Sequence, residues 1–495
     1  MKTQKKIREF SAVLILLVTV LSLIGVRADL VDTKVGSYSG CEGCFNLSVL
    51  KADLLIVYIT IGILLLAGLF RSSIPRRVLH LGFGLVLLFY IADLFVFKLF
   101  NFRLFFADIM LYFEEWTVVW EQFSSGLGGD WTAFLAVAAV IALFLALFFM
   151  PAIRGPHARI VLLATLTVAL FTDVLIDSPI YVNSWATDNV FQLNLGTSER
   201  TEYTSDFVAK VTESQPTERK IRSALPAQSG RNVIMVILES WSSWHSKGFG
   251  GIYDWTPQLD AAARRGRSFS NFHGIGFATV NGLVGILAGQ NIWSPFLPLL
   301  ERTPFHSQWG NERTLPSVFS KHGYKTAFLT TGPLTLYRKG EWMQDIGFGH
   351  VEGGEHPAYA NEKRFAFDSP SDSALYRRAL EWMQAERDPY FLVLETVTTH
   401  QPYTDPVSGE RSLEKAMRFA DQAFGEFLQR LNDVNFFDRG LLLVVSDHRS
   451  MTPVFAEEID QFGPAAISQV PAFFMGNEFV SQTVDDRVFS QADLL

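Results

Sequence analysis

Cysteine is almost absent from the chain. The 495 residues include only two cysteines, Cys41 and Cys44, and none follows them. One CxxC pair supplies two thiolates, so a complete thiolate zinc site is excluded. The pair itself can form a loop disulfide, act as a redox pair or remain as two thiols, and we expect the disulfide.

An excess of positive charge is also lacking. The chain carries 42 Lys and Arg against 50 Asp and Glu, which gives a net charge of −8. A protein that binds nucleic acid needs a basic surface to neutralise phosphates, and no basic stripe is present here. We therefore expect no nucleic-acid partner.

Long apolar runs are confined to about the first 180 residues. A helix needs about 20 mostly apolar residues to cross ~30 Å of hydrocarbon. Five runs meet this requirement: Ser11–Val26, Leu54–Phe70, Val78–Phe100, Trp131–Met150 and Ile160–Ile176. The first run follows the basic segment MKTQKKIR, as in a signal peptide. We interpret it as a retained span because no clean small-x-small cleavage site precedes Arg27 and further spans follow at once.

Basic residues predict how these spans are oriented. The N-terminus, the loop RSSIPRR and the loop PAIRGPHAR are rich in Lys and Arg, and five spans place all three on one side. That side is expected to be the cytoplasm. The aromatic segment Asn101–Trp120 then lies along the outer membrane surface. The remainder of the chain is extracellular or periplasmic, attached to a plasma (inner) membrane.

The composition divides the chain into three parts. We predict a membrane domain over residues 1–176, a connector over residues 177–230 and a water-soluble domain over residues 231–495. The connector mixes Ser, Thr, Asn, Pro and charged residues, with helical periodicity around Phe207–Val211. We expect it to be partly helical.

The water-soluble part has the pattern of an α/β fold. Short apolar runs end abruptly in polar residues, in NVIMVILES, KTAFLTTG, PYFLVLETVTTH and GLLLVVSDH. Amphipathic helical stretches separate them, at residues 256–266, 371–387 and 413–433. Such runs are typical of buried strands, so we predict a mainly parallel sheet flanked by helices.

Polar residues follow these runs, where open α/β sheets bind their ligands. The candidates are Glu239, Thr330 or Thr331, His400, and the adjacent pair Asp447 and His448. Carboxylate, imidazole and hydroxyl groups at one edge predict a metal or phosphate site. Each residue also has a structural alternative, since a Glu after a strand is often a helix N-cap and a His can cap a turn.

The segment GIGFAT, residues 274–279, precedes another apolar helix. Its glycines match a dinucleotide fingerprint only in part, so we interpret it as a turn before a helix that begins near Thr279. A hydroxyl there lies in the positive field of the helix N-terminus. A coordinating metal would activate it as a nucleophile. An ordinary N-cap is the alternative, and one residue can serve both purposes.

NVIMVILES, the Thr some forty residues later, TTHQPY and VVSDH together resemble the lipoteichoic acid synthase-like branch of the alkaline phosphatase/sulfatase superfamily, as does the five-span anchor. The resemblance implies that Glu239, Thr279, Asp447 and His448 bind one divalent metal and that Thr279 is the nucleophile. His400 would stabilise the phosphoryl group or protonate the leaving oxygen. Manganese is expected, with magnesium or zinc as alternatives.

The segment TTGPLTLYRKGEW, residues 330–342, matches the family's head-group-recognition segment poorly. It lacks the His and Asp that relatives place after this strand. Arg338 and Trp342 are similar to the family's substrate-contacting Arg and Trp; Arg338 can clamp a phosphate or be an ordinary surface residue. VFSQADLL, residues 488–495, resembles a segment after which such domains normally continue, so we expect a C-terminal truncation.

The function implied by the resemblance is transfer of a phosphoglycerol head group through a phospho-threonine intermediate. The donor would be a membrane phospholipid, phosphatidylglycerol first, and the acceptor a glycan or glycolipid. Phosphoethanolamine transferase is an alternative, although such relatives usually carry several disulfides. A sulfatase-type hydrolase needs a Cys or Ser nucleophile, and residue 279 is Thr. A non-catalytic membrane scaffold is disfavoured because all four candidate ligands are intact.

Overall fold

The computed structural model describes most of the chain: residues 2–33, 46–100, 103–106, 109, 120, 123–124, 127–176, 187–195, 230–290, 313–401, 403–452, 454, 456–477 and 483–495. They form two compact units. The first contains residues 2–109 and 123–195 of this set, and the second contains residue 120 and residues 230–495. Cys41, Cys44, Phe207–Val211 and most of Asn101–Trp120 lie outside the described residues.

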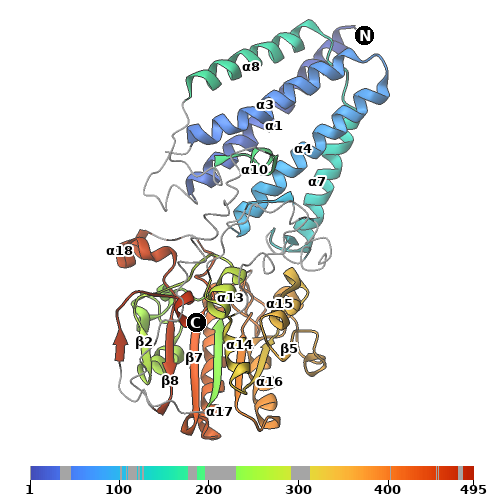
Figure 1. Cartoon of the computed structure of the whole chain (residues 1–495). Coiled ribbons are helices and arrows are strands. Elements are labelled where there is room, and N and C mark those ends of the chain that lie inside the picture. Colours follow the sequence, from blue (N-terminus) through green and yellow to red (C-terminus); the bar gives the residue numbers. More distant parts are fainter. Residues whose placement is uncertain are drawn as a thin grey trace. The chain divides into compact units, whose positions relative to one another are not determined.

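The first unit is built from five long apolar helices (Figure 1), which are α1 (Lys2–Val31), α3 (Asn46–Leu69), α4 (Ser73–Phe100), α7 (Asp130–Phe148) and α8 (Pro156–Leu175). Each contains a segment long and apolar enough to cross a membrane. The five predicted spans are therefore confirmed as helices. Large apolar side chains remain exposed along α7 and α8, as expected of helices that face lipid. The short helix α10 (Val190–Leu195) lies in the predicted connector.

Two Arg–Asp pairs are buried in this unit. Arg27 of α1 lies 3.0 Å from Asp53 of α3, and Arg103 binds Asp93 of α4 at 2.7 Å. Both guanidinium groups also donate to the backbone carbonyl of Asp188, just before α10. A charge in apolar surroundings must be paired and hydrogen-bonded. The two pairs therefore hold the segment before α10 against the helices.

An eight-stranded sheet forms the centre of the second unit, in the order β5-β4-β6-β1-β7-β8-β2-β9. Its strands are β1 (Asn232–Leu238), β2 (Arg267–Phe269), β4 (Lys325–Thr330), β5 (His350–Glu352), β6 (Tyr390–Glu395), β7 (Gly440–Ser446), β8 (Ala472–Met475) and β9 (Thr483–Asp485). β8 is antiparallel to both neighbours, and the other pairings are parallel. β3 (Phe272–His273) and β10 (Phe489–Ser490) form a separate pair. The predicted mainly parallel α/β fold is confirmed.

Helices cover both faces of this sheet because its central strands are apolar on both sides. Along β1, Ile234, Val236 and Leu238 pack in one core with α12 (Pro257–Arg264), α16 (Asp372–Ala385) and α17 (Leu413–Asp433). The alternate residues Val233, Met235 and Ile237 pack in the other core, with α13 (Thr279–Ala288), α14 (Leu315–Lys321) and α15 (Lys339–Asp345). This alternation is the period-two geometry of a strand. A further helix, α18, spans Ala456–Phe462.

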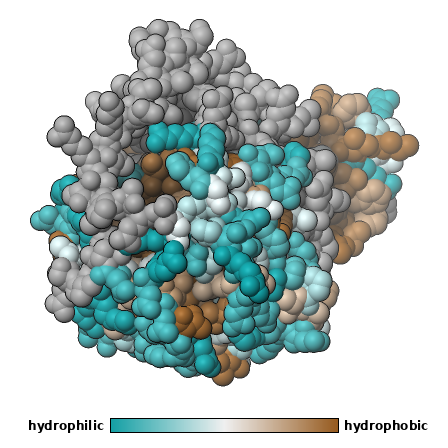
Figure 2. Space-filling model, turned by 60° about the horizontal axis from the view of Figure 1, so that its bottom comes forward, coloured by the Kyte–Doolittle hydropathy of each residue, from teal (hydrophilic) through white to brown (hydrophobic). Residues whose placement is uncertain are grey.

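The face of the second unit seen in Figure 2 is that of a water-exposed domain. Figure 2 brings the lower end of Figure 1 forward and shows a face made mainly of hydrophilic residues, with small separate apolar areas. On α17, buried apolar residues recur every three or four positions, such as Ala420, Phe424, Phe427 and Leu431. Most of the remaining residues of that helix are polar, as in an amphipathic helix at a surface.

The topology brings four strand ends to one edge of the sheet. β4, β6, β1 and β7 are neighbours and parallel, so their carboxyl ends lie together. The residues that follow them include Thr331, His400, Glu239 and Asp447, which are the residues selected from the sequence. This edge is where an open α/β sheet binds ligands.

Candidate active site

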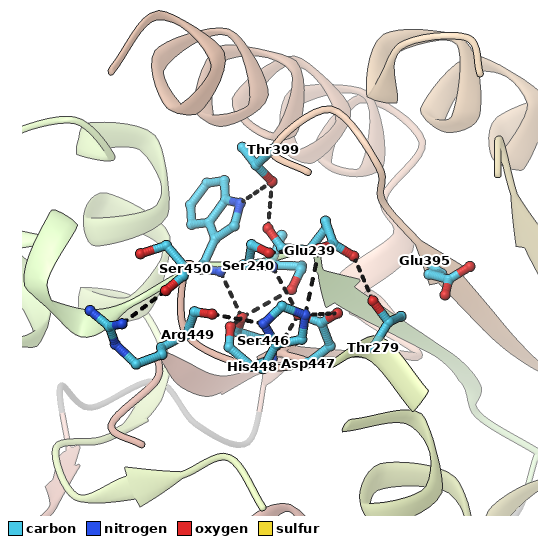
Figure 3. Close-up of polar contacts among 12 residues, drawn as sticks. Glu239, Ser240, Thr279, Glu395, Thr399, Ser446, Asp447, His448, Arg449 and Ser450 are labelled. Atoms are coloured by element: carbon cyan, nitrogen blue, oxygen red, sulfur yellow. Dashed lines mark hydrogen bonds and ion pairs between the residues drawn. The ribbon is translucent and has the colours of Figure 1, made fainter. Parts of the chain in front are cut away.

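Three potential metal ligands meet at this edge (Figure 3). Glu239 directly follows β1, and Asp447 and His448 directly follow β7. One ligand atom from each lies within 4.8 Å of the others, and all three side chains are buried. Because β1 and β7 are paired up to their last residues, the side chains that follow them are necessarily adjacent.

Hydrogen bonds fix the direction of the Asp447 and His448 side chains. Asp447 Oδ1 accepts from the backbone N–H groups of Ser240 and His448, at 2.8 and 2.7 Å. His448 Nδ1 donates to the carbonyl of Arg449 at 2.7 Å, so a neutral ring carries its lone pair on Nε2. Asp447 Oδ2 and His448 Nε2 have no hydrogen-bond partner among the described residues. Two adjacent buried atoms with available lone pairs fit a cation.

The electrostatics of the site also fit a cation. Burial and the neighbouring Glu239 raise the pKa of Asp447 well above its ordinary value. Burial alone would raise the pKa of Glu239 too, but His400 and His448 hold it below its ordinary value. Burial lowers the pKa of His448 and favours the neutral ring that a metal requires. A divalent ion would neutralise the two carboxylates, so the donor set fits one such metal.

Thr279 is the first residue of α13 and lies within reach of Glu239. Its Oγ1 donates to Glu239 Oε2 at 3.2 Å (Figure 3). The N-cap position belongs to Ala278, which has extended backbone angles, so the hydroxyl of Thr279 is directed to the carboxylate. The simple N-cap interpretation of Thr279 is therefore wrong. The helix N-terminus adds a positive field at this hydroxyl.

A close contact between backbones holds α13 against the Asp447 loop. A Cβ on Gly282, three residues after Thr279, would lie 2.2 Å from the Asp447 carbonyl oxygen. Only glycine permits this approach. The contact therefore sets the distance between the helix that carries the candidate nucleophile and the loop that carries two of the candidate ligands.

Gln491 is a supporting residue that the sequence reasoning missed. Its buried amide donates to the carbonyls of Ser446 and Asp447, at 2.7 and 2.5 Å. Its Oε1 accepts from the N–H of Ile275 at 3.0 Å, in the turn before α13. Gln491 thus connects the loop that carries Asp447 to the turn that precedes Thr279. The similarity of VFSQADLL to a family segment was a signal for this role.

Threonines near His400 support Glu239 in a similar way. Thr396 Oγ1 accepts from the Glu239 N–H at 2.9 Å, and the Thr399 hydroxyl donates to the Glu239 carbonyl. His400 Nδ1 donates to the Gln401 carbonyl at 2.6 Å, and its charge acts on Glu239 and His448. The structure therefore brings His400 close to the candidate ligands Glu239 and His448.

The two candidate head-group residues occupy different surroundings. Arg338 is half exposed and pairs with Glu341. Trp342 is 0% exposed and packs in the core with α13. Thr330 and Thr331 are buried at the end of β4. The substrate-binding role of Arg338 and Trp342 stays a prediction.

Comparisons with known proteins agree with this geometry. The family model described as Sulfatase matches residues 231–495. Lipoteichoic acid synthase 1 of Bacillus subtilis (strain 168) is 20% identical over 264 residues, which cover 49% of this chain and 41% of that protein. Phosphoglycerol transferase I of Xanthomonas campestris pv. campestris (strain B100) is 22% identical over 252 residues, 46% of this chain and 35% of that protein. The chain thus spans less than half the length of either relative.

One solved structure is similar in fold over nearly the full chain. It is the integral membrane protein lipooligosaccharide phosphoethanolamine transferase A from Neisseria meningitidis. The TM-score is 0.51 at 14% sequence identity, over 90% of this chain and 93% of that one. The similarity includes a helical membrane part as well as the α/β part.

Proposed function

Because the chain belongs to the sulfatase family through residues 231–495, we propose that it is a membrane-anchored, metal-dependent phosphotransferase. It moves a phosphoglycerol head group from phosphatidylglycerol to a glycan or glycolipid acceptor through a phospho-threonine intermediate. The observation that carries the proposal is the hydrogen bond from Thr279 to Glu239, inside the buried group formed with Asp447 and His448.

The residues suited to hold the metal are Glu239, Thr279, Asp447 and His448. Three oxygen donors and one imidazole favour manganese, with magnesium or zinc as alternatives. When bound, the ion would lower the pKa of the Thr279 hydroxyl and neutralise charge on the phosphoryl oxygens. The hydrogen bonds on Asp447 and His448 orient both side chains before any ion binds.

In the first half-reaction, the Thr279 oxygen attacks the donor phosphorus and the bond to the diacylglycerol oxygen breaks. As the new bond forms, the hydroxyl proton passes along the hydrogen bond to Glu239 Oε2, which leaves an oxygen lone pair for the attack. The N–H groups at the start of α13 stabilise the phosphoryl oxygens. His400 gives a proton to the departing diacylglycerol oxygen.

In the second half-reaction, an acceptor hydroxyl attacks the phosphothreonine. His400, now deprotonated, takes the proton of that hydroxyl. The bond between phosphorus and the Thr279 oxygen breaks, Glu239 returns the proton to that oxygen, and both residues are back in their starting state. The phosphoglycerol group is then on the acceptor, so the two steps balance without a further reagent.

The membrane part favours a lipid as the phosphoryl donor. Five apolar helices make the chain a multi-pass membrane protein. The basic loops favour a catalytic unit on the extracellular or periplasmic side of a plasma (inner) membrane. Nucleoside triphosphates are scarce there, which makes the phospholipid of the same bilayer the simplest phosphoryl donor.

Two other activities are weaker candidates. A sulfatase-type hydrolase needs a Cys or Ser nucleophile, and Thr occupies position 279. A phosphoethanolamine transferase would use the same threonine chemistry on a different head group. The donor test below therefore separates the two transferases by measurement.

The experiment uses full-length protein in mixed lipid–detergent micelles, with labelled phosphatidylglycerol or phosphatidylethanolamine and with or without Mn²⁺. We expect manganese-dependent release of labelled diacylglycerol and a phosphorylated Thr279 detectable by mass spectrometry. Thr279→Ala is expected to abolish both. Thr279→Ser, which retains a hydroxyl, is the matched variant. Release at the parental rate by Thr279→Ala would refute the nucleophile assignment.

A further inference from the structure

A second charged pair is buried at the same edge of the sheet, and the proposed mechanism does not use it. Lys339 Nζ lies 2.6 Å from Glu395 Oε2, and the two side chains are only 11% and 3% exposed. Glu395 Oε1 is buried and has no hydrogen-bond partner among the described residues. A buried acceptor is unfavourable without a donor, so this atom favours a ligand that supplies one.

The register of the sheet puts Glu395 on the face that carries the nucleophile. Glu395, the last residue of β6, pairs with Ile237 of β1. Paired side chains on adjacent strands project to the same face. Ile237 packs in the core that includes α13, and α13 begins with Thr279. In Figure 3, Glu395 accordingly appears on the Thr279 side of Glu239.

The end of β4 completes this group of polar atoms. Thr330 pairs with Glu395 across the sheet. A Cβ on Gly332 would lie 3.4 Å from Thr330 Oγ1 and 3.6 Å from Lys339 Nζ. The ammonium, the Thr330 hydroxyl and the Glu395 carboxylate therefore lie together at the carboxyl ends of β4 and β6, next to the strand that leads to Glu239.

The net charge of the Lys339–Glu395 pair decides which hydrogen-bond donor suits Glu395 Oε1. Lys339 neutralises Glu395, so the buried pair has no net charge. An ammonium group bound to Oε1 would place a second positive charge near Lys339, which is unfavourable at low dielectric. A hydroxyl donates the same hydrogen bond and adds no charge. The pair therefore suits an uncharged polyol.

We propose that Lys339 and Glu395 form the head-group specificity site. The site takes an uncharged polyol, such as the glycerol of a phosphoglycerol group, through a hydroxyl that donates to Glu395 Oε1. It selects against a head group that carries an ammonium, such as ethanolamine. This inference rests on the proposed phosphotransfer at Thr279 and assigns its donor class.

The test compares phosphatidylglycerol and phosphatidylethanolamine as donors for the full-length protein and for Lys339→Met. Without Lys339, the Glu395 carboxylate is unbalanced and favours an ammonium. We expect the ratio of kcat/KM for the two lipids, glycerol over ethanolamine, to fall about tenfold or more, the effect of one hydrogen bond to a charged group. In Lys339→Met/Glu395→Gln, which is uncharged but keeps an acceptor oxygen, the preference for phosphatidylglycerol should return.

Lys325→Met is the matched control, since it removes an exposed lysine at the opposite end of β4. The parent's donor ratio should be unchanged in it. If Lys339→Met does not turn over lipid, its affinities for glycerol phosphate and for phosphoethanolamine are measured by calorimetry instead. A preference for glycerol phosphate equal to that of the parent overturns the inference. A parent that uses phosphatidylethanolamine as well as phosphatidylglycerol also overturns it, while phosphotransfer stands. A parent that uses neither lipid contradicts the proposed function itself.

Discussion

Replacement of Gly282 by alanine tests how Thr279, the proposed nucleophile, is positioned. The added Cβ would lie 2.2 Å from the Asp447 carbonyl oxygen, and ordinary contact begins at 3.4 Å, so the separation must grow by 1.2 Å. Both sides of the contact are backbone, and no flexible side chain can move aside. Either α13 or the Asp447 loop has to shift.

The stability effect of this change is expected to be small and the activity effect large. Overpacking costs about 1–3 kcal/mol, and replacing Gly by Ala within a helix recovers up to about 1 kcal/mol. The net loss of stability is then about 0–3 kcal/mol. A displacement of about 1 Å between reacting groups lowers rates about 100-fold. Gly282→Ala should therefore stay folded and lose nearly all activity.

The assay measures the release of labelled diacylglycerol together with the thermal unfolding midpoint. Gly349→Ala is the control, because its Cβ would meet its nearest atom, the Thr326 carbonyl oxygen, at an ordinary 3.7 Å. This control should keep both parental activity and parental stability. If Gly282→Ala were as active as the parent, the backbone contact would not determine where Thr279 lies.

Three further predictions address support and stability. Burial alone would raise the pKa of Glu352, but contacting basic side chains hold it at about 2. The parent should therefore be more stable than Glu352→Gln above about pH 4.5, and this difference in unfolding free energy should vanish as the pH falls to about 2. Unfolding of both proteins measured as a function of pH checks this. Gln491→Ala should weaken manganese binding about 10- to 100-fold in a metal titration. An unchanged affinity would contradict the supporting role of Gln491. Asp93→Asn leaves Arg103 buried without its charge partner and should cost about 3–5 kcal/mol. Glu414→Gln, at an exposed pair, should cost under about 1 kcal/mol, and equal melting of these two variants would contradict the reasoning.

The sequence predicted the central elements because their patterns are strong. The strands β1, β4, β6 and β7 are continuous apolar runs, and α17 begins and ends at the predicted residues, Leu413 and Asp433. The five membrane helices follow from length and hydrophobicity alone. In each case the local pattern and the tertiary environment favour the same structure.

The edges of the sheet were not predicted. Strands β2, β3, β5, β8, β9 and β10 contain only two to four residues each, too few for a periodicity to be recognised. Their pairing depends on neighbours that are distant in the sequence; β2, for example, lies between β8 and β9. The antiparallel direction of β8 is likewise a property of the assembled sheet.

Composition and motifs by themselves determined the membrane anchor, the α/β class and the residue types at the strand ends. Local chemistry suffices there, because apolar length, strand alternation and polar strand ends are encoded by neighbours in the chain. Only the tertiary structure decided that Gly282 touches the Asp447 backbone, that Gln491 joins two loops and that Lys339 neutralises Glu395. These contacts join residues between 44 and 216 positions apart. Such residues come together in space only once the sheet has assembled.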